Sequence, residues 1–133
     1  IVWWCMDMLM PRHRNLDVTV KLTKTFEDGA QGFCYQGDDD RDFTIEIDHR
    51  LSRATSKEEF IECIMHEMVH VWQGATGRIK DKFRGGYKKL WKCKDGKYRN
   101  YLNTAYEKQP WEVQAYKMQG PLTKTFMKEY DYE

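Results

Sequence analysis

The sequence predicts a single α+β domain spanning residues 1–133, with a small three-stranded sheet. Three observations predict it: alternating apolar and polar residues before residue 50, a capped amphipathic segment from Ser56, and a second helical segment from Pro110. With 133 residues, 41% of them hydrophobic, the chain can form a core without disulfide cross-links. We expect the order helix, three strands, helix, hairpin, helix.

Three segments in the first half of the chain have the pattern of strands. Residues 16–26 carry apolar side chains at alternate positions up to Leu22, and residues 43–48 place three apolar side chains on one face. Residues 30–35 form a weaker strand. A turn signal at residues 27–29 and a polar segment at 37–42 separate the three strands. The polar segment lacks the spacing and the closing Glu of an EF-hand, so we interpret it as a plain turn.

The central helix has start and stop signals. Ser56, with Glu59 three residues later, is a capping box, and a broad arc of apolar residues follows it. Gly74 is suited to the C-terminal cap of this helix.

The remaining elements flank the central helix. Residues 1–9 predict a helix that packs on the core and stops near Pro11. Residues 88–101 predict a hairpin that turns at Asp95-Gly96. Pro110 is suited to the first turn of a C-terminal helix, and Gly120-Pro121 is expected to interrupt or end it.

An H-E-x-x-H motif, residues His66 to His70, lies in the middle of the predicted central helix. Residues four apart lie one turn apart on the same face, so His66 and His70 can both reach one Zn²⁺ ion. Both lie opposite the main apolar arc, unlike core histidines. Glu67, at the edge of that face, can act as general base toward a water that zinc makes acidic. The alternative is a pair of solvated histidines on a surface helix.

A catalytic zinc site needs a third protein ligand and an open fourth position. The chain has four histidines and none follows His70, which excludes a downstream histidine. Glu112 is the first candidate, because it projects from the first turn of the helix that Pro110 starts. A carboxylate there also complements the helix dipole. Glu107 is the second candidate, and His49, after the third strand, is the third.

Other side chains near the motif are candidates for supporting roles. Tyr101, Tyr106 and Tyr116 are candidate hydrogen-bond donors to a transition state, and the sequence does not choose among them. Cys63 lies three residues before His66 on nearly the same face, and we interpret it as a buried thiol rather than a ligand. We also expect the third strand to lie near the cleft and to pair with an extended substrate.

The chain resembles the gluzincin metallopeptidases in its order of elements: strands, then an H-E-x-x-H helix, then a later helix with Glu in an E-x-x-A setting. The H-E-x-x-H segment matches the first motif of that family, and Glu112 with Ala115 matches the second. The resemblance implies a compact zincin-like domain that hydrolyses peptide bonds of a protein or peptide substrate, with zinc as cofactor. In that family an Asp often follows the Ala and supports a zinc-binding His. This chain has Tyr116 at that position.

The string His-Glu-Met-Val-His-Val-Trp-Gln also resembles the active helix of SprT-like and Spartan proteases, which act on DNA-bound proteins. Those proteases use a third His, which this chain lacks. The short chain and its Pro-Trp-Glu segment are similar to small predicted metallopeptidases encoded by bacteriophages. The resemblance covers the order of elements over residues 43–118, whereas specific motifs occupy about fifteen positions.

Charge is distributed unevenly along the chain. The whole chain has a net charge of +1, but residues 78–99 contain ten Lys or Arg and two Asp, which gives this segment +8. Its aromatic residues could stack on unpaired bases while Lys88, Lys89 and Lys92 bind phosphates. We favour the alternative, a solvated hairpin whose aromatic residues pack on the core. The rival function is therefore a non-catalytic zinc-containing module that binds nucleic acid or a host protein through residues 78–99.

The cysteines and the N-terminal residues predict a compartment. The four cysteines are widely separated and form no C-x-x-C pair, so we interpret them as reduced thiols of a cytoplasmic protein, in the host cytoplasm if a phage encodes it. The apolar residues 1–8 lack the features of a signal peptide and are too short to span a bilayer, so we expect no membrane partner.

Overall fold

The computed structural model describes residues 1–12, 15–23, 32–37, 41–50 and 56–130. Along the chain these residues form α1 (Val2–Leu9), β1 (Asp17–Thr23), β2 (Gly32–Gln36), β3 (Asp42–Asp48), α3 (Lys57–Ala75), β4 (Ile79–Lys82), β5 (Lys88–Lys92), β6 (Tyr98–Asn100), the short 3-10 helix η1 (Tyr106–Lys108) and α4 (Pro110–Glu129). The α+β class is confirmed. The predicted turn at residues 27–29 and the middle of the polar segment, residues 38–40, lie outside the described residues.

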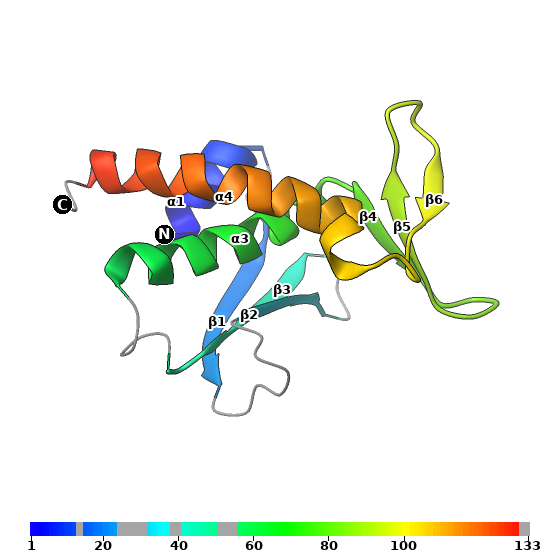
Figure 1. The fold of residues 1–133 in the computed structure, drawn as a ribbon, viewed down its shortest axis with the longest axis horizontal. Helices are drawn as coiled ribbons and strands as arrows, with labels where there is room; N and C mark the ends of the chain where they lie inside the picture. The colour runs from blue at the N-terminus through cyan, green and yellow to red at the C-terminus, as the bar shows by residue number, and fades with distance from the viewer. Residues whose placement is uncertain (13–14, 24–31, 38–40, 51–55, 131–133) are drawn as a thin grey trace.

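The helices and the first sheet form layers (Figure 1). The long helices α3 and α4 lie side by side and run in opposite directions, and α1 packs beside them. The first sheet has the order β1-β3-β2, with β1 parallel and β2 antiparallel to the central strand β3. This mixed sheet covers the side of α3 that faces away from α4. The helix α3 is therefore enclosed between the sheet and α4.

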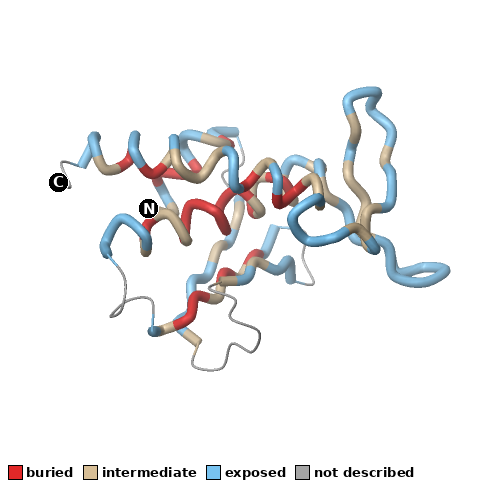
Figure 2. Tube along the Cα trace, in the orientation of Figure 1, coloured by how far each residue is buried: buried red, intermediate tan, exposed pale blue. Residues whose placement is uncertain are grey.

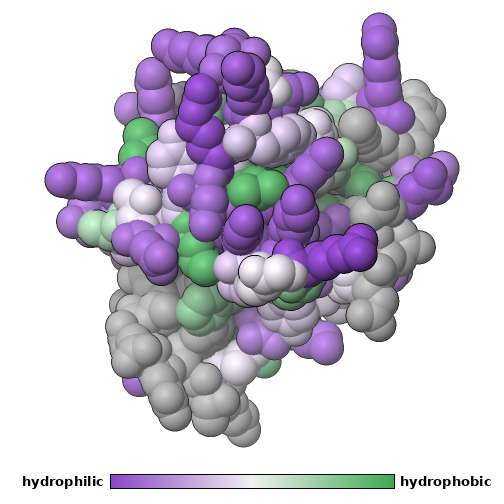
Figure 3. Space-filling view, turned by 90° about the vertical axis from the view of Figure 1, so that its right-hand side faces the viewer, coloured by the Kyte–Doolittle hydropathy of each residue, from purple (hydrophilic) through white to green (hydrophobic). Residues whose placement is uncertain are grey.

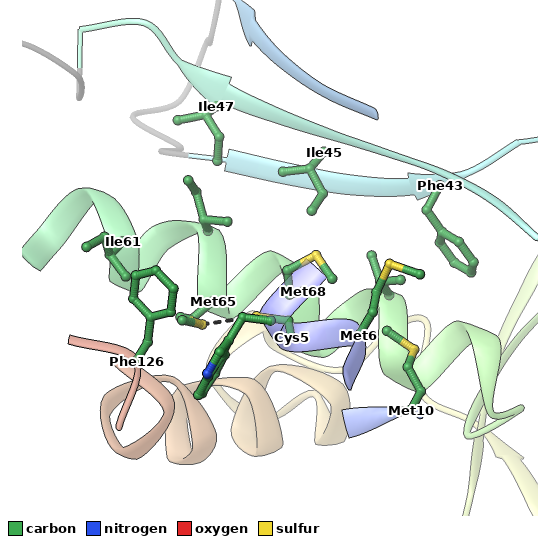
Figure 4. Packing of buried hydrophobic residues seen from close by; sticks show 13 residues of the cluster. Cys5, Met6, Met10, Phe43, Ile45, Ile47, Ile61, Met65, Met68 and Phe126 are labelled. Carbon is green, nitrogen blue, oxygen red and sulfur yellow. Dashed lines mark hydrogen bonds between the residues drawn. The ribbon is translucent and has the colours of Figure 1, made fainter. Parts of the chain in front are cut away.

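The core lies between β3 and α3 (Figure 4). Phe43, Ile45 and Ile47 are at most 3% exposed and point from β3 toward the helix, as their alternation predicts. Met65 and Met68 of α3 meet them, and α1 closes the core with Cys5 and Met6 among its buried residues. Burial of each such side chain contributes about 1.5–3 kcal/mol. The N-terminal helix was thus correctly predicted as part of the core.

The predicted cap at Gly74 is wrong, because α3 continues to Ala75. Gly77, with φ of +77°, takes the position after the helix that requires a left-handed backbone. The amide of Arg78 donates to the Gln73 carbonyl at 2.9 Å, and that of Gly77 donates to Gly74 at 3.2 Å, which completes a Schellman motif. Gly74 has another role: a Cβ there would lie 2.8 Å from the Phe43 ring.

The predicted N-terminal cap of α3 is present, since the Ser56 hydroxyl accepts from the Glu59 amide at 3.2 Å. The C-terminal helix begins at Pro110, as predicted, but it does not end at Gly120-Pro121. Proline disfavours helical geometry at the residue before it through a clash with that residue's Cβ, which glycine lacks. Pro121 is itself exposed, so α4 passes through it to Glu129.

The predicted hairpin is present, and a further strand pairs with it. Strands β5 and β6 turn through Gly96, which has φ of +83°, and β4 adds to β5 with Ile79 opposite Trp91. This second sheet, β4-β5-β6, projects from the end of the molecule where α3 ends and α4 begins (Figure 1). We call it the wing, residues 79–100. None of the described helices has the length and apolar character needed to cross a membrane.

Candidate metal centre

The antiparallel helices α3 and α4 bring three candidate ligands together. The Glu112 Oε1 atom lies 2.9 Å from His66 Nε2 and 3.1 Å from His70 Nε2. His66 and Glu112 are buried, and His70 is half-buried. Ala115, one turn after Glu112, is fully buried and small, which lets the helices approach closely. The side chains that the sequence predicted as ligands therefore meet from two elements.

The spacing of these atoms suits a metal ion. Ligands about 2.0–2.1 Å from a tetrahedral Zn²⁺ lie about 3.3 Å apart, so the Glu112 contacts are within a few tenths of an ångström of that separation. Ligand atoms of His66, Glu67 and His70 all lie within 4.8 Å of one another. This group of three contains the carboxylate of Glu67 and not that of Glu112. Of the two carboxylates, Glu112 is the better candidate for the third ligand, because one of its oxygens contacts both Nε2 atoms.

Two glutamine side chains orient the histidine rings. The Nδ1 atom of His66 is 2.6 Å from Gln119 Oε1, and that of His70 is 2.8 Å from Gln73 Oε1. The NH₂ group of Gln119 donates to Glu62, and the NH₂ group of Gln73 donates to the Trp111 carbonyl and to Gln114. Both amide oxygens therefore face the rings as acceptors, so each ring carries its proton on Nδ1.

In that tautomer the Nε2 lone pairs of both rings point at the Glu112 carboxylate. Three acceptors about 3 Å apart repel one another unless a cation or a proton lies among them. Burial lowers the pKa of His66, but the carboxylates of Glu112 and Glu67 and the amide oxygen of Gln119 together outweigh burial, and the pKa lies above its usual value. Burial raises the pKa of Glu112, but both histidines outweigh it and hold the pKa at about 2. The donor set therefore fits zinc.

Glu67 lies beside this group without being needed as a ligand. Its side chain is 5% exposed and lines the cleft next to His66 and His70. Burial raises the pKa of Glu67, which makes its carboxylate a stronger proton acceptor than one in water, although the two histidines oppose the shift. Its position and basicity are those of a general base.

The site opens into a cleft of about 1010 Å³. Residues of α3 and α4 line it together with the strand β2 on one side and part of the wing on the other. The predicted pairing of a substrate with the third strand is wrong, because β3 is central and both of its edges are already paired, with β1 and β2. Of β3, Phe43 alone is among the described lining residues, whereas β2 contributes all five of its residues and forms the edge of the sheet.

The structure separates the three candidate tyrosines. The hydroxyl of Tyr106 donates to Glu112 Oε1 and lies 3.2 Å from the Tyr116 hydroxyl. The Tyr116 ring contacts His66 with 4.5 Å between ring centroids, at the position where the family often has Asp. Tyr101 instead contacts Cys93 in the wing and is not among the described residues lining the cleft.

The alternative ligands lie elsewhere. Glu107 is exposed on η1, and His49 follows β3 beside Asp48, 3.7 Å from its carboxylate. Neither is among the described residues that line the cleft. Cys63 does line it, but only half-buried rather than buried as predicted, and burial raises its pKa to about 12, so it is a protonated thiol. The sequence signals did not include Gln73 or Gln119, since an amide belongs to no metal-binding motif, nor Glu62, whose contact with Gln119 joins residues 57 apart.

The three candidate lysines lie on the wing. Lys88 and Lys92 are exposed, and the Lys89 ammonium lies over the Trp111 ring, 4.6 Å from its centroid. The interpretation that the wing's aromatic residues pack on the core holds only in part. Trp91 and Tyr98 are half-buried, whereas Phe83, 74% exposed, stacks on the exposed Tyr87 with 5.2 Å between centroids.

No protein-family model, curated protein or solved structure matches this chain.

Proposed function

We propose that this protein is a zinc-dependent metallopeptidase of the gluzincin or SprT-like kind, with a zincin-like domain. The observation that carries the proposal is the convergence of His66 Nε2, His70 Nε2 and Glu112 Oε1, all oriented as acceptors, beside the buried carboxylate of Glu67. Such a set leaves one position of a tetrahedral site open for water, as catalytic zinc sites do. Structural zinc sites are closed instead.

Zinc, when bound, supplies a Lewis acid that makes water acidic at neutral pH and polarises a carbonyl. Glu67 takes the proton from the attacking water and delivers it to the leaving amine as the C–N bond breaks. The Tyr106 hydroxyl lies next to Glu112 and the Tyr116 hydroxyl lies next to that of Tyr106, so either can donate to the oxygen on which negative charge develops.

The substrate is a protein or peptide segment in extended conformation. The strand β2 is an edge strand within the described sheet, and its residues form one wall of the cleft. A chain in extended conformation can lie along this wall with a peptide bond above Glu67. The cytoplasmic compartment is part of the proposal: all four cysteines are free thiols, as a reducing environment keeps them.

Substitution Glu67→Gln tests the proposal. It keeps the size of the side chain and removes the proton acceptor, so we expect zinc content to stay near one per chain and hydrolysis of an unfolded protein substrate such as casein to fall by about 10²-fold or more. Zinc content is measured by atomic absorption and hydrolysis by release of labelled peptides. Equal rates for wild type and Glu67→Gln would exclude Glu67 as the base, and a wild-type chain that binds zinc but cleaves no protein substrate would favour a non-catalytic module.

A second candidate function is nucleic-acid binding by the wing, favoured by the exposed stack of Phe83 and Tyr87 among basic residues. On the face that carries the wing, hydrophilic residues predominate and hydrophobic ones form small separate patches (Figure 3). Replacing Lys88, Lys89 and Lys92 with Glu should weaken binding of single-stranded DNA and flatten its salt dependence by about one unit of slope for each phosphate that a lysine no longer neutralises. If the wild-type chain shows no detectable binding at low salt, the interpretation of the wing as a solvated hairpin is the one that stands.

A further inference from the structure

The hydrogen bond that orients His66 depends on a carboxylate one turn earlier on α3. Gln119 lies between Glu62 and His66: its Oε1 is 2.6 Å from His66 Nδ1, and its Nε2 donates to Glu62 Oε1 at 2.7 Å. The two ends of an amide have nearly the same shape, so the neighbouring groups decide which end is the oxygen. An ionised carboxylate only accepts, and it therefore holds the NH₂ of Gln119 toward Glu62 and the oxygen toward His66.

The hydrogen bonds that hold Gln73 against His70 differ from those that hold Gln119 against His66. The NH₂ of Gln73 donates to the Trp111 carbonyl at 3.0 Å and to Gln114 at 2.9 Å, and Gln73 is fully buried. Two acceptors hold that amide in one orientation. In the described part of the chain, the NH₂ of Gln119 has Glu62 as its one acceptor, and Gln119 is only half-buried. The orientation at His66 thus depends on a single side chain.

The geometry points to Glu62 as a positioning residue for the metal centre: through Gln119 it fixes His66 with the proton on Nδ1 and the Nε2 lone pair directed at Glu112. This inference rests on the proposed zinc site. If the Gln119 amide were reversed, its NH₂ would face Nδ1, which would then have to accept. The ring proton would move to Nε2 and occupy the position of the metal.

The test compares Glu62→Gln with Glu62→Met in the full chain, by competition for zinc with a chromophoric chelator. Both substitutions remove the same charge and keep a similar length, but only glutamine retains an oxygen that can accept from Gln119. We expect Glu62→Met to weaken zinc binding by about tenfold to a hundredfold, and Glu62→Gln by less than about threefold. Glu59→Met, a charge loss one turn earlier on the same cleft wall, is the control and should bind zinc as wild type does.

A second set of variants exchanges donor and acceptor. Glu62→Lys places a group that only donates opposite Gln119, which favours the reversed amide, so its zinc affinity should fall below that of Glu62→Met. Adding Gln119→Glu supplies a carboxylate that accepts both from the new ammonium and from His66 Nδ1. We expect this double variant to bind zinc about tenfold more tightly than Glu62→Lys alone. Circular dichroism checks that each variant is folded.

The outcomes separate the two proposals. Equal zinc affinities for Glu62→Gln and Glu62→Met, or a double variant no tighter than Glu62→Lys, would overturn the role of Glu62 and leave the zinc site in place. A wild-type chain that binds no zinc would overturn both the proposed function and the role of Glu62. A full match to the expected order supports a positioning role, because a purely structural role would change stability without discriminating donor from acceptor.

Discussion

The α3–α4 pair and the wing are neighbouring regions that differ in how far their residues are buried. The helices hold most of the buried residues along with β3, whereas no residue of the wing is buried (Figure 2). The candidate metal centre places polar groups in the enclosed region, and each of its histidines has a polar side-chain atom within 3.1 Å of both ring nitrogens. The wing instead displays charge to solvent. Enclosure makes the orientation of a polar group matter, because an unpaired buried acceptor costs about 1–3 kcal/mol.

This contrast predicts that substitutions in the helix pair have large effects on zinc and those in the wing have small ones. The connection between the two regions is limited. Tyr98 donates to the Gly77 carbonyl at the end of α3, and Lys89 lies over Trp111 of α4. The wing is therefore attached at its base, next to the cleft, while its tip at Phe83 is exposed.

The largest expected effect comes from removing the carboxylate that bridges the histidines. Glu112→Ala should weaken zinc binding by about a hundredfold or more, because the loss of a ligand exceeds the tenfold to hundredfold loss caused by removing an outer partner. Isothermal titration of the metal-free chain measures this affinity. Glu107→Ala is the matched control, since Glu107 is a nearby carboxylate that is exposed on η1, and it should leave the affinity unchanged.

A reversal of those two results would refute the gluzincin-like assignment of the third ligand. It would leave His66 and His70 as ligands, because their side chains converge independently of Glu112 on one face of α3. Loss of zinc in both variants would instead indicate that the turn containing η1 must be intact for α4 to dock on α3.

How far the sequence could predict the site depends on how local each signal is. The spacing of His66 and His70 is set within one helix, and Pro110 marks the helix start that carries Glu112, so these positions follow from the sequence. The Gln119–Glu62 hydrogen bond joins residues 57 apart. It exists only because α4 docks on α3, and two polar residues at that separation give no pattern that predicts it.

The same distinction between local and long-range signals explains the errors in the predicted fold. Alternation predicted the strands before residue 50, and it matches the burial of β3, but in β1 the apolar residues Val20 and Leu22 are exposed. The strand order could not be predicted, and the third strand proved central rather than an edge. Gly74 was predicted as a cap from its local position, whereas its role depends on the Phe43 ring across the core. Glycine at 120 was interpreted as a helix breaker, although beside proline it removes a clash.

A smaller effect is expected where α3 crosses β3. Gly74→Ala places a methyl group 2.8 Å from the Phe43 ring, and overpacking of this kind costs about 1–3 kcal/mol. Alanine recovers up to about 1 kcal/mol through its higher helix propensity. We expect the free energy of unfolding to fall by about 1 kcal/mol, as measured by urea denaturation.

A double variant identifies the cause of that loss. In the Phe43→Leu background the side chain that meets the new methyl group is smaller, so Gly74→Ala should cost less there than in wild type. The same cost in both backgrounds would show that the Phe43 ring is not what requires glycine at position 74.

The smallest effect is expected at the tip of the wing. Phe83 is 74% exposed and its described aromatic contact is with Tyr87, itself exposed, so Phe83→Ala should change the free energy of unfolding by no more than about 0.5 kcal/mol. Zinc affinity should not change, because the tip does not touch the metal centre. Tyr98→Phe, at the base of the wing, is the comparison: it removes the hydrogen bond to Gly77 and should cost about 0.5–1.5 kcal/mol. Urea denaturation and zinc titration of both variants measure the gradient from base to tip. A loss for Phe83→Ala as large as that for Tyr98→Phe would mean that the tip contributes to the stability of the fold, and the exposed stack would then no longer count as a surface available for a ligand.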